Sequence, residues 1–180
     1  MKCRFLVSSV AGTHAVAAWL FRSLVSESSA AVTVGLYGGL GAGKTEFVRG
    51  FVHTGQYAGD VTSPTFVLES TYSLPEYTRQ VCHWDLYRLK PTESEIELAD
   101  ERLVAGNILL VEWPEKLPWL ADGIDIAVTL ESQSAEGSPA DSSDLPLARI
   151  VSVETFGGWR EKLREPCPSH ADVTVIDEGE

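Results

Sequence analysis

The chain has 180 residues, of which 44% are apolar and 22% are charged, and its formal net charge is −12 at pH 7. This length and apolar content predict one folded domain, and they exclude both a disordered chain and two full domains. The acidic surplus disfavours unaided binding to nucleic acid, because it repels a phosphate backbone.

The N-terminal segment carries two basic residues ahead of a short apolar run, 5–7, which raises a secretion signal as an alternative. Ser8 and Ser9 interrupt that run at once, and no stretch of the chain approaches the ~20 apolar residues of a membrane helix. The three cysteines are widely spaced, which favours neither a disulfide framework nor a zinc site. We therefore expect a cytoplasmic protein without a membrane segment.

The first elements along the chain are a helix, a strand, a loop and a second helix. Apolar residues recur at helical spacing after Thr13, which predicts an amphipathic helix with Thr13 as its N-cap and Trp19 in the core. The β-branched run 32–37 predicts a buried strand, 38–43 a glycine-rich loop and 44–52 a helix. A strand, a glycine loop and a helix in this order begin an α/β nucleotide-binding fold.

The loop and the start of its helix read GGLGAGKT and satisfy the pattern G-x-x-x-x-G-K-[ST]. Glycines let the backbone turn several N–H groups toward one anion, and the following helix adds the positive end of its dipole. Lys44 is predicted to reach the β- and γ-phosphates, and the Thr45 hydroxyl to ligate Mg²⁺. The candidate binding residues are Gly39, Leu40, Gly41, Ala42, Gly43, Lys44 and Thr45. A chance glycine loop is the weaker interpretation, because a strand and a helix flank it.

The next segments combine hydroxyl groups with one acid. The segment 61–72 predicts a polar turn that leads into a strand, and 81–89 predicts another extended segment. The turn 62–65, TSPT, either senses a γ-phosphate or is an ordinary capped proline turn. Asp85 lies between apolar neighbours, where an unpaired carboxylate is costly, so either a magnesium shell or a pairing with Arg88 is expected.

A second acid follows a buried strand. The segment 92–95 has the form of a capping box and predicts a helix to about residue 104. The apolar run 108–111 predicts a buried strand that ends at Glu112. Such a strand presents its terminal carboxylate at the sheet edge where the glycine loop lies, so Glu112 is predicted to hold magnesium or to orient the attacking water. An ordinary carboxylate on the surface is the alternative.

The remainder of the chain predicts, in order, a strand, a polar surface loop, a strand and a short helix, at 124–130, 131–146, 148–155 and 159–164. The tail from residue 165 contains prolines and acidic residues and is predicted to be loose. The expected organisation is one domain, 1–164, followed by a loose tail, 165–180. The only asparagine is Asn107, so a guanine-reading NKxD motif is absent, which argues against a GTPase.

Four motifs occur in order: GGLGAGKTEFVRGF, VTSPTF, HWDLYRL and LLVEWPEK. Together they resemble the TsaE family, also called YjeE, over roughly residues 13–130. The resemblance implies a P-loop NTPase-like α/β fold, a three-layer sandwich around a central, mostly parallel sheet. It also implies an ATPase that is slow alone and that acts with the TsaB and TsaD proteins in threonylcarbamoylation of adenosine 37 in tRNAs that read ANN codons. The tRNA is then met only through the complex.

The resemblance also assigns roles by matched position. Phosphates and metal are expected at Gly41, Gly43, Lys44 and Thr45. Glu112 is expected to contact magnesium, with Trp113 at the same strand end, and Asp85 and Thr65 are expected around the γ-phosphate. The implied cofactors are ATP and Mg²⁺, the implied catalytic residues are Lys44, Glu112 and Asp85, and the implied metal ligands are Thr45, Glu112 and Asp85.

Three features depart from the pattern of that family. Position 39 is glycine where the family usually has aspartate, and Glu46 stands where the family usually has threonine. The segment 131–146 is longer than usual, so contacts with adenine there are left open. The departure at Glu46 predicts weaker nucleotide binding unless its side chain points away from the phosphates.

Two other classes of function are alternatives to an accessory ATPase. A small-molecule P-loop kinase needs a basic lid, whereas the main predicted loop is acidic and rich in serine, with Arg160 and Arg164 flanking one short helix. A module that senses nucleotide without hydrolysing it is the other alternative. Weak self-association of the chain is also left open.

Overall fold

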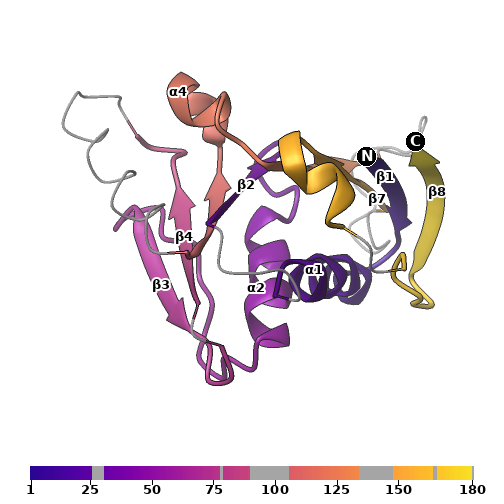
Figure 1. Cartoon of the computed structure of the whole chain (residues 1–180), viewed down its shortest axis with the longest axis horizontal. Helices are drawn as coiled ribbons and strands as arrows, with labels where there is room; N and C mark the ends of the chain where they lie inside the picture. The colour runs from indigo at the N-terminus through magenta and orange to yellow at the C-terminus, as the bar shows by residue number, and fades with distance from the viewer. Residues whose placement is uncertain (26–30, 78, 90–105, 134–147, 164–165, 180) are drawn as a thin grey trace, which may run out of the picture.

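The computed structural model describes residues 1–25, 31–77, 79–89, 106–133, 148–163 and 166–179. Their strands form one eight-stranded sheet in the order β3-β4-β5-β2-β6-β7-β1-β8 (Figure 1). The strands are β1 (Lys2–Val7), β2 (Val32–Tyr37), β3 (Glu69–Ser73), β4 (Gln80–Asp85), β5 (Ile108–Glu112), β6 (Ile126–Ser132), β7 (Arg149–Thr155) and β8 (Val173–Gly179). The helices are α1 (Val10–Val25), α2 (Lys44–Thr54) and α4 (Pro118–Ala121), with 3₁₀ turns η2 (Pro114–Lys116) and η3 (Gly157–Glu161).

The core of this sheet is parallel. β4, β5, β2 and β6 pair in parallel, and β3 and β7 join its two sides in antiparallel fashion. The predicted α/β class with a mostly parallel central sheet is confirmed for this core. The crossovers bring the carboxyl ends of β2, β4 and β5 to one edge, which is where ligands bind in open parallel sheets.

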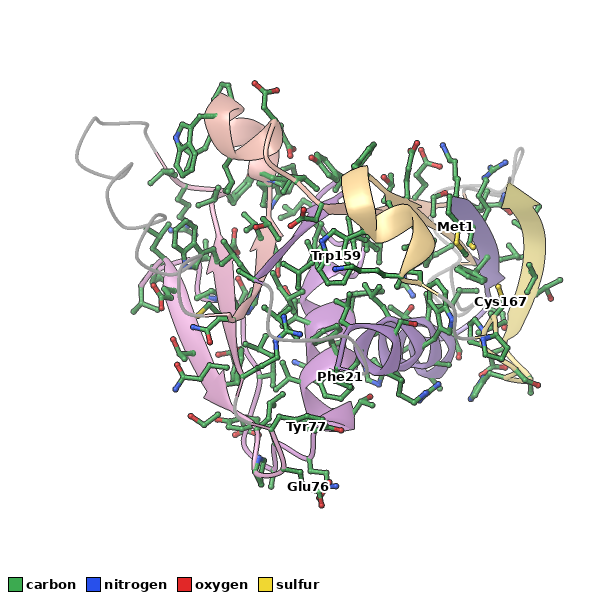
Figure 2. All side chains as sticks on the ribbon, viewed as in Figure 1. Met1, Phe21, Glu76, Tyr77, Trp159 and Cys167 are labelled. Carbon is green, nitrogen blue, oxygen red and sulfur yellow. The ribbon has the colours of Figure 1, made fainter. Side chains whose placement is uncertain are left out.

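Helices α1 and α2 pack together against one face of the sheet (Figure 1). Trp19 lies in the core as predicted, 1% exposed and edge-on to Phe5. The ring of Phe21 meets the rings of Phe51 and Tyr77 edge-on, with centroids 5.1 Å and 5.3 Å away (Figure 2). These aromatic contacts fix α2, and with it the loop that precedes α2, relative to the sheet.

The first helix begins earlier than predicted. The hydroxyl of Ser9 accepts a hydrogen bond from the Gly12 N–H at 3.0 Å, so Ser9 is the N-cap of α1. The prediction that Thr13 is the cap is wrong, because Thr13 is buried inside the first turns. The last predicted helix, 159–164, is instead the 3₁₀ turn η3 at 157–161.

The opposite face of the sheet carries a smaller apolar cluster beneath η2 and α4. Its buried members are Cys82, Trp84, Leu86, Leu109, Val111, Leu117 and Leu120. The helix predicted from Thr92 to Val104 and most of the loop predicted at 131–146 lie outside the described residues. The elements that the structure describes on this face of the sheet are therefore η2 and α4.

Both ends of the chain lie on the outer side of the sheet, where β1 pairs with β7 and β8 (Figure 1). The prediction of a loose tail from residue 165 is wrong, because β8 extends the sheet and Asp172 anchors its start. The Asp172 carboxylate accepts a hydrogen bond from the Ser9 hydroxyl at 2.6 Å, and its backbone carbonyl accepts one from the Ser8 N–H at 3.1 Å. The domain thus extends beyond residue 164. In the described part of the chain, no helix combines the length and apolar character needed to cross a membrane.

Candidate functional site

The glycine-rich loop joins the carboxyl end of β2 to the first turn of α2, as predicted. Gly38, Gly41 and Gly43 have φ angles of 135°, 75° and 101°, which side-chain-bearing residues rarely adopt. At Gly38 a Cβ would also collide with the Leu130 carbonyl oxygen. This conformation leads the backbone round to the N-terminus of α2, where free N–H groups and the helix dipole favour an anion.

Lys44 lies folded back over the loop in which it is embedded. Its Nζ donates to the carbonyl oxygens of Gly38 at 2.7 Å and Gly39 at 2.9 Å. The same ammonium lies 3.8 Å from the centre of the Trp113 ring, a cation–π contact. Burial lowers the pKa of Lys44, although the carboxylates of Glu112, Asp85 and Glu115 oppose that effect. The Lys44 ammonium is therefore held beside the glycine loop by two carbonyl oxygens and an aromatic ring. These groups bind it weakly, so an anionic ligand can replace them.

Glu112 ends β5 beside the loop and is 4% exposed. Its Oε1 accepts hydrogen bonds from the Thr45 hydroxyl at 2.7 Å and from Nε2 of His83 at 3.0 Å. Nδ1 of His83 lies 3.5 Å from the Tyr72 hydroxyl. Thr45 and Glu112 thus meet as predicted, and both side chains offer oxygen atoms of the kind that Mg²⁺ prefers.

Asp85 ends β4, in register with Glu112 on β5. Its Oδ2 accepts hydrogen bonds from the hydroxyls of Ser63 and Thr65, and its Oδ1 accepts one from the Tyr87 N–H at 3.0 Å. Burial raises the pKa of Asp85, but the hydrogen bonds from Ser63, Thr65 and Tyr87 outweigh it, so the pKa lies below its ordinary value. Asp85 is therefore held as a carboxylate next to Glu112.

Two expectations about this turn have a definite outcome. Of the two alternatives for Asp85, the pairing with Arg88 is wrong. No Asp85–Arg88 ion pair occurs among the described residues, and the Arg88 guanidinium lies 4.4 Å from the Phe66 ring centre. The hydroxyl-rich turn 62–65 is more than a capped proline turn, because Ser63 and Thr65 bind across the chain to Asp85. The turn and the carboxylate therefore form one unit.

Trp113 follows Glu112 in a left-handed backbone conformation, with φ of 60°. A large side chain in this region costs about 1–3 kcal/mol and is kept only where the surroundings hold it. The Trp113 ring contacts both the Lys44 ammonium and the Tyr87 ring, whose centre is 5.1 Å away. The strained turn thus places an aromatic wall beside the lysine.

These residues surround one cavity of about 620 Å³. Its lining includes nine residues predicted from the sequence: Leu40, Gly41, Gly43, Lys44, Thr45, Thr65, Asp85, Glu112 and Trp113. Two predicted residues do not line it. Ala42 is buried in the core, and Gly39 contributes its carbonyl to Lys44. No group of three or more His, Cys, Asp or Glu side chains placed to hold a metal occurs among the described residues.

Glu46 also lines the cavity, but its carboxylate is engaged on the α1 side. It pairs with Arg49 and with Nε2 of His14, the latter at 3.1 Å. Burial raises the pKa of Glu46, and the contacts with Arg49 and His14 more than offset this, so its pKa lies below the ordinary value. Arg49 neutralises much of the charge, which reduces the predicted penalty on nucleotide binding.

His83 is the main residue of the site that sequence reasoning missed. A signal was present, because residues two apart in a strand share one face, so His83 lies on the same face as Asp85. Tyr87 was missed as well, although it stands in the same HWDLYR motif.

We predict that His83→Phe, which keeps a ring but removes the donor to Glu112, lowers the free energy of unfolding by about 1–3 kcal/mol, since a buried carboxylate loses a partner. Urea denaturation measures this. Tyr72→Phe is the control, because it removes the hydroxyl that contacts His83 and Ser70 but keeps the hydrogen bond from His83 to Glu112. Equal stability of His83→Phe and wild type would contradict the role of this hydrogen bond.

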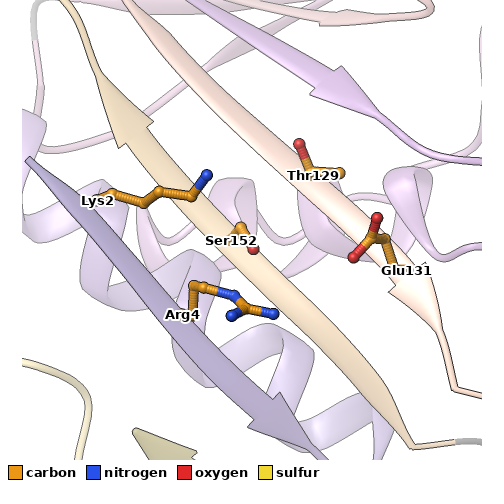
Figure 3. Close-up of a pocket in the computed structure, with 5 residues that line it drawn as sticks. All are labelled: Lys2, Arg4, Thr129, Glu131 and Ser152. Atoms are coloured by element: carbon orange, nitrogen blue, oxygen red, sulfur yellow. The ribbon is translucent and has the colours of Figure 1, made fainter. Parts of the chain in front are cut away.

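A second cavity, of about 400 Å³, lies on the outer strands (Figure 3). Lys2, Arg4, Thr129, Glu131 and Ser152 line it from three neighbouring strands. It has no glycine loop and no helix N-terminus, and an acid stands beside its two basic residues. The first cavity is therefore the candidate functional site.

Comparisons with known proteins agree with this arrangement. A sequence model of the family described as threonylcarbamoyl adenosine biosynthesis protein TsaE matches residues 7–139. A relative named tRNA threonylcarbamoyladenosine biosynthesis protein TsaE, from Rickettsia felis, is 42% identical over 99 residues, covering 53% of this chain and 56% of that protein. A relative of the same name from Haemophilus influenzae is 36% identical over 102 residues, covering 56% and 63%.

These alignments span little more than half the length of the curated relatives. Similarity in fold covers more of the chain than similarity in sequence does. A crystal structure of Bacillus subtilis YdiB has a TM-score of 0.65 with this chain and covers 91% of both chains at 19% identity. That likeness concerns the fold alone.

Proposed function

This chain belongs to the family of the threonylcarbamoyl adenosine biosynthesis protein TsaE, and on that premise we propose that it is an ATP-binding and ATP-hydrolysing component of tRNA threonylcarbamoyladenosine formation. The observation that carries the proposal is the junction of the loop at Lys44 and Thr45 with the paired strand ends at Asp85 and Glu112. Backbone N–H groups, one lysine and two carboxylates at a single sheet edge are what a magnesium-bound triphosphate requires.

Phosphate binding is assigned to the loop and Lys44. An entering phosphate replaces the Gly38 and Gly39 carbonyl oxygens as acceptor for the ammonium. Charge-assisted hydrogen bonds to phosphate are stronger than those to neutral carbonyl groups, which supplies the driving force for the exchange. The aromatic wall of Trp113 and Tyr87 limits the access of water on that side.

Magnesium is assigned to Thr45 and Glu112, with Asp85 beside them. The Thr45 hydroxyl and Oε1 of Glu112 already lie 2.7 Å apart. Hydroxyl and carboxylate oxygens suit a hard cation that takes its remaining ligands from water and phosphate. When bound, the ion neutralises charge on the phosphates. His83 holds Glu112, and Ser63 and Thr65 hold Asp85 in its ionised form, so that the carboxylates can orient a water molecule.

The partners proposed are TsaB and TsaD, with tRNA met only through them. Large exposed apolar side chains lie at or next to residues that line the cavity. Leu40, which lines it, is 78% exposed, and Phe66 and Val67, which follow Thr65 in the chain, are 84% and 70% exposed. Apolar side chains gathered at the rim of a site are typical of a surface that another protein covers. The net charge of −12 likewise argues against direct binding to tRNA.

We expect ATP turnover to be slow for the isolated chain and to rise at least about tenfold when TsaB and TsaD are added, because P-loop switches depend on partners to complete the site. Turnover is measured by release of inorganic phosphate. Nucleoside analysis of tRNA after depletion of the protein is expected to show loss of threonylcarbamoyladenosine. Equal turnover with and without the partners would count against the proposal.

A further inference from the structure

Arg149, the first residue of β7, packs against the glycine loop. A Cβ at Gly43 would lie 3.5 Å from Nε of Arg149 and 3.8 Å from its Cζ. Gly43 is the residue immediately before Lys44 and lines the main cavity. A permanently charged guanidinium therefore lies against the loop that the proposed function assigns to phosphates.

One donor of this guanidinium, Nε, lacks a partner. Nε of Arg149 is buried and makes no hydrogen bond, and no ion pair of Arg149 occurs among the residues that the structure describes. A buried donor without an acceptor is costly, and more so when it carries charge. An acceptor supplied by a ligand would remove that cost.

The order of strands indicates which part of a nucleotide reaches Arg149. Glu112 ends β5, on one side of the loop-bearing strand β2, whereas β6 and then β7 lie on the other side. In the proposed function the metal and the terminal phosphate lie on the Glu112 side. The nucleoside end must then extend toward β6 and β7.

We infer that Arg149 binds the α-phosphate, the phosphate group that carries the nucleoside, through its guanidinium. This assignment rests on the proposed function, because it needs a nucleotide in the loop. It adds a binding residue from outside the four sequence motifs, on a strand that neither the glycine loop nor the two carboxylates belong to.

The first experiment measures Mg·ADP binding by calorimetry and thermal unfolding without ligand, for the wild type and for Arg149→Met. Binding is expected to weaken about ten- to hundredfold, the usual effect of losing a hydrogen bond to a charged group. The ligand-free melting temperature is expected to stay equal or to rise, because an unpartnered donor has been removed. A purely structural role of Arg149 would lower it and would overturn the inference.

Arg4→Met is the matched control. Arg4 lies on β1 beside the second cavity, so its loss makes the same change of charge on the same sheet away from the loop (Figure 3). Its effect on ADP binding is expected to stay within about twofold. An equal loss of affinity in Arg4→Met and Arg149→Met would show that the change in net charge alone causes the effect, and it would overturn the inference.

A second measurement uses the unmodified chain and does not depend on how a variant folds. In a proton–nitrogen spectrum of arginine side chains, the Nε–H signal of Arg149 is expected to shift on addition of AMP or Mg·ADP and to stay in place on addition of adenosine. A shift with adenosine, or none with AMP or ADP, overturns the assignment to the α-phosphate. If the wild type binds no Mg·ADP in calorimetry, the proposed function fails and this inference with it. If the wild type binds Mg·ADP, but the Arg149 signal does not respond to it and Arg149→Met binds it equally well, the inference alone fails.

Discussion

Lys44→Ala is expected to weaken binding of Mg·ATP and Mg·ADP by at least about a hundredfold. The ammonium is the cation embedded in the glycine loop, and its transfer from two carbonyl oxygens to phosphate is worth roughly 1.5–3 kcal/mol for each charged hydrogen bond. Isothermal calorimetry with purified protein measures the change. Trp113 gives a second readout, because the ammonium lies 3.8 Å from its ring centre and leaves it when phosphate binds.

Lys162→Ala is the control for Lys44→Ala. Nζ of Lys162 also lies over a tryptophan ring, 4.5 Å from the centre of Trp159, but η3 and its surroundings are remote from the loop. Its loss is expected to leave nucleotide affinity unchanged. An affinity of Lys44→Ala within threefold of wild type would remove the basis for every role assigned to the loop.

Glu112→Gln is expected to reduce ATP turnover in the presence of TsaB and TsaD by about 10²–10⁴-fold, the range for losing a group that orients or deprotonates the attacking water. The amide keeps the size of the side chain and an acceptor for Thr45 and His83, so the local hydrogen bonds can be kept while the charge is lost. Nucleotide binding without magnesium is expected to change much less than turnover. Phosphate release and calorimetry separate the two quantities.

Glu115→Gln makes the same chemical change three residues away on an exposed position of η2, and it is expected to leave turnover near that of wild type. A cellular test separates hydrolysis from sensing. If a strain that carries Glu112→Gln retains threonylcarbamoyladenosine in its tRNA, hydrolysis is dispensable and the chain is a nucleotide-sensing module.

Much of the site was predictable from the sequence because its parts are local. Four glycines, a lysine and a threonine within eight residues specify the loop, since only glycine accepts the positive φ angles at 38, 41 and 43 without strain. Asp85 and Glu112 were predictable because each ends an apolar extended run, and parallel strands bring such ends to one edge.

The partners of these residues were not predictable in the same way. Ser63 stands 22 residues before Asp85, and His83 stands 29 residues before Glu112. His83 meets Glu112 because β4 and β5 are neighbours in register. Ser63 meets Asp85 because the segment 63–68 lies against the end of β4. Arg149 is a clearer case, because its contact with Gly43 spans the width of β2, β6 and β7.

The sequence by itself determined the glycine loop, the two strand-end acids and the α/β class, because backbone conformational preference and the period of apolar residues act over a few neighbouring positions. The tertiary structure alone decided which groups hold those acids, the pairing of the predicted loose tail with β1, and the approach of Arg149 to the loop. Those contacts join segments far apart in the chain, and the packing of the whole sheet sets which of them form.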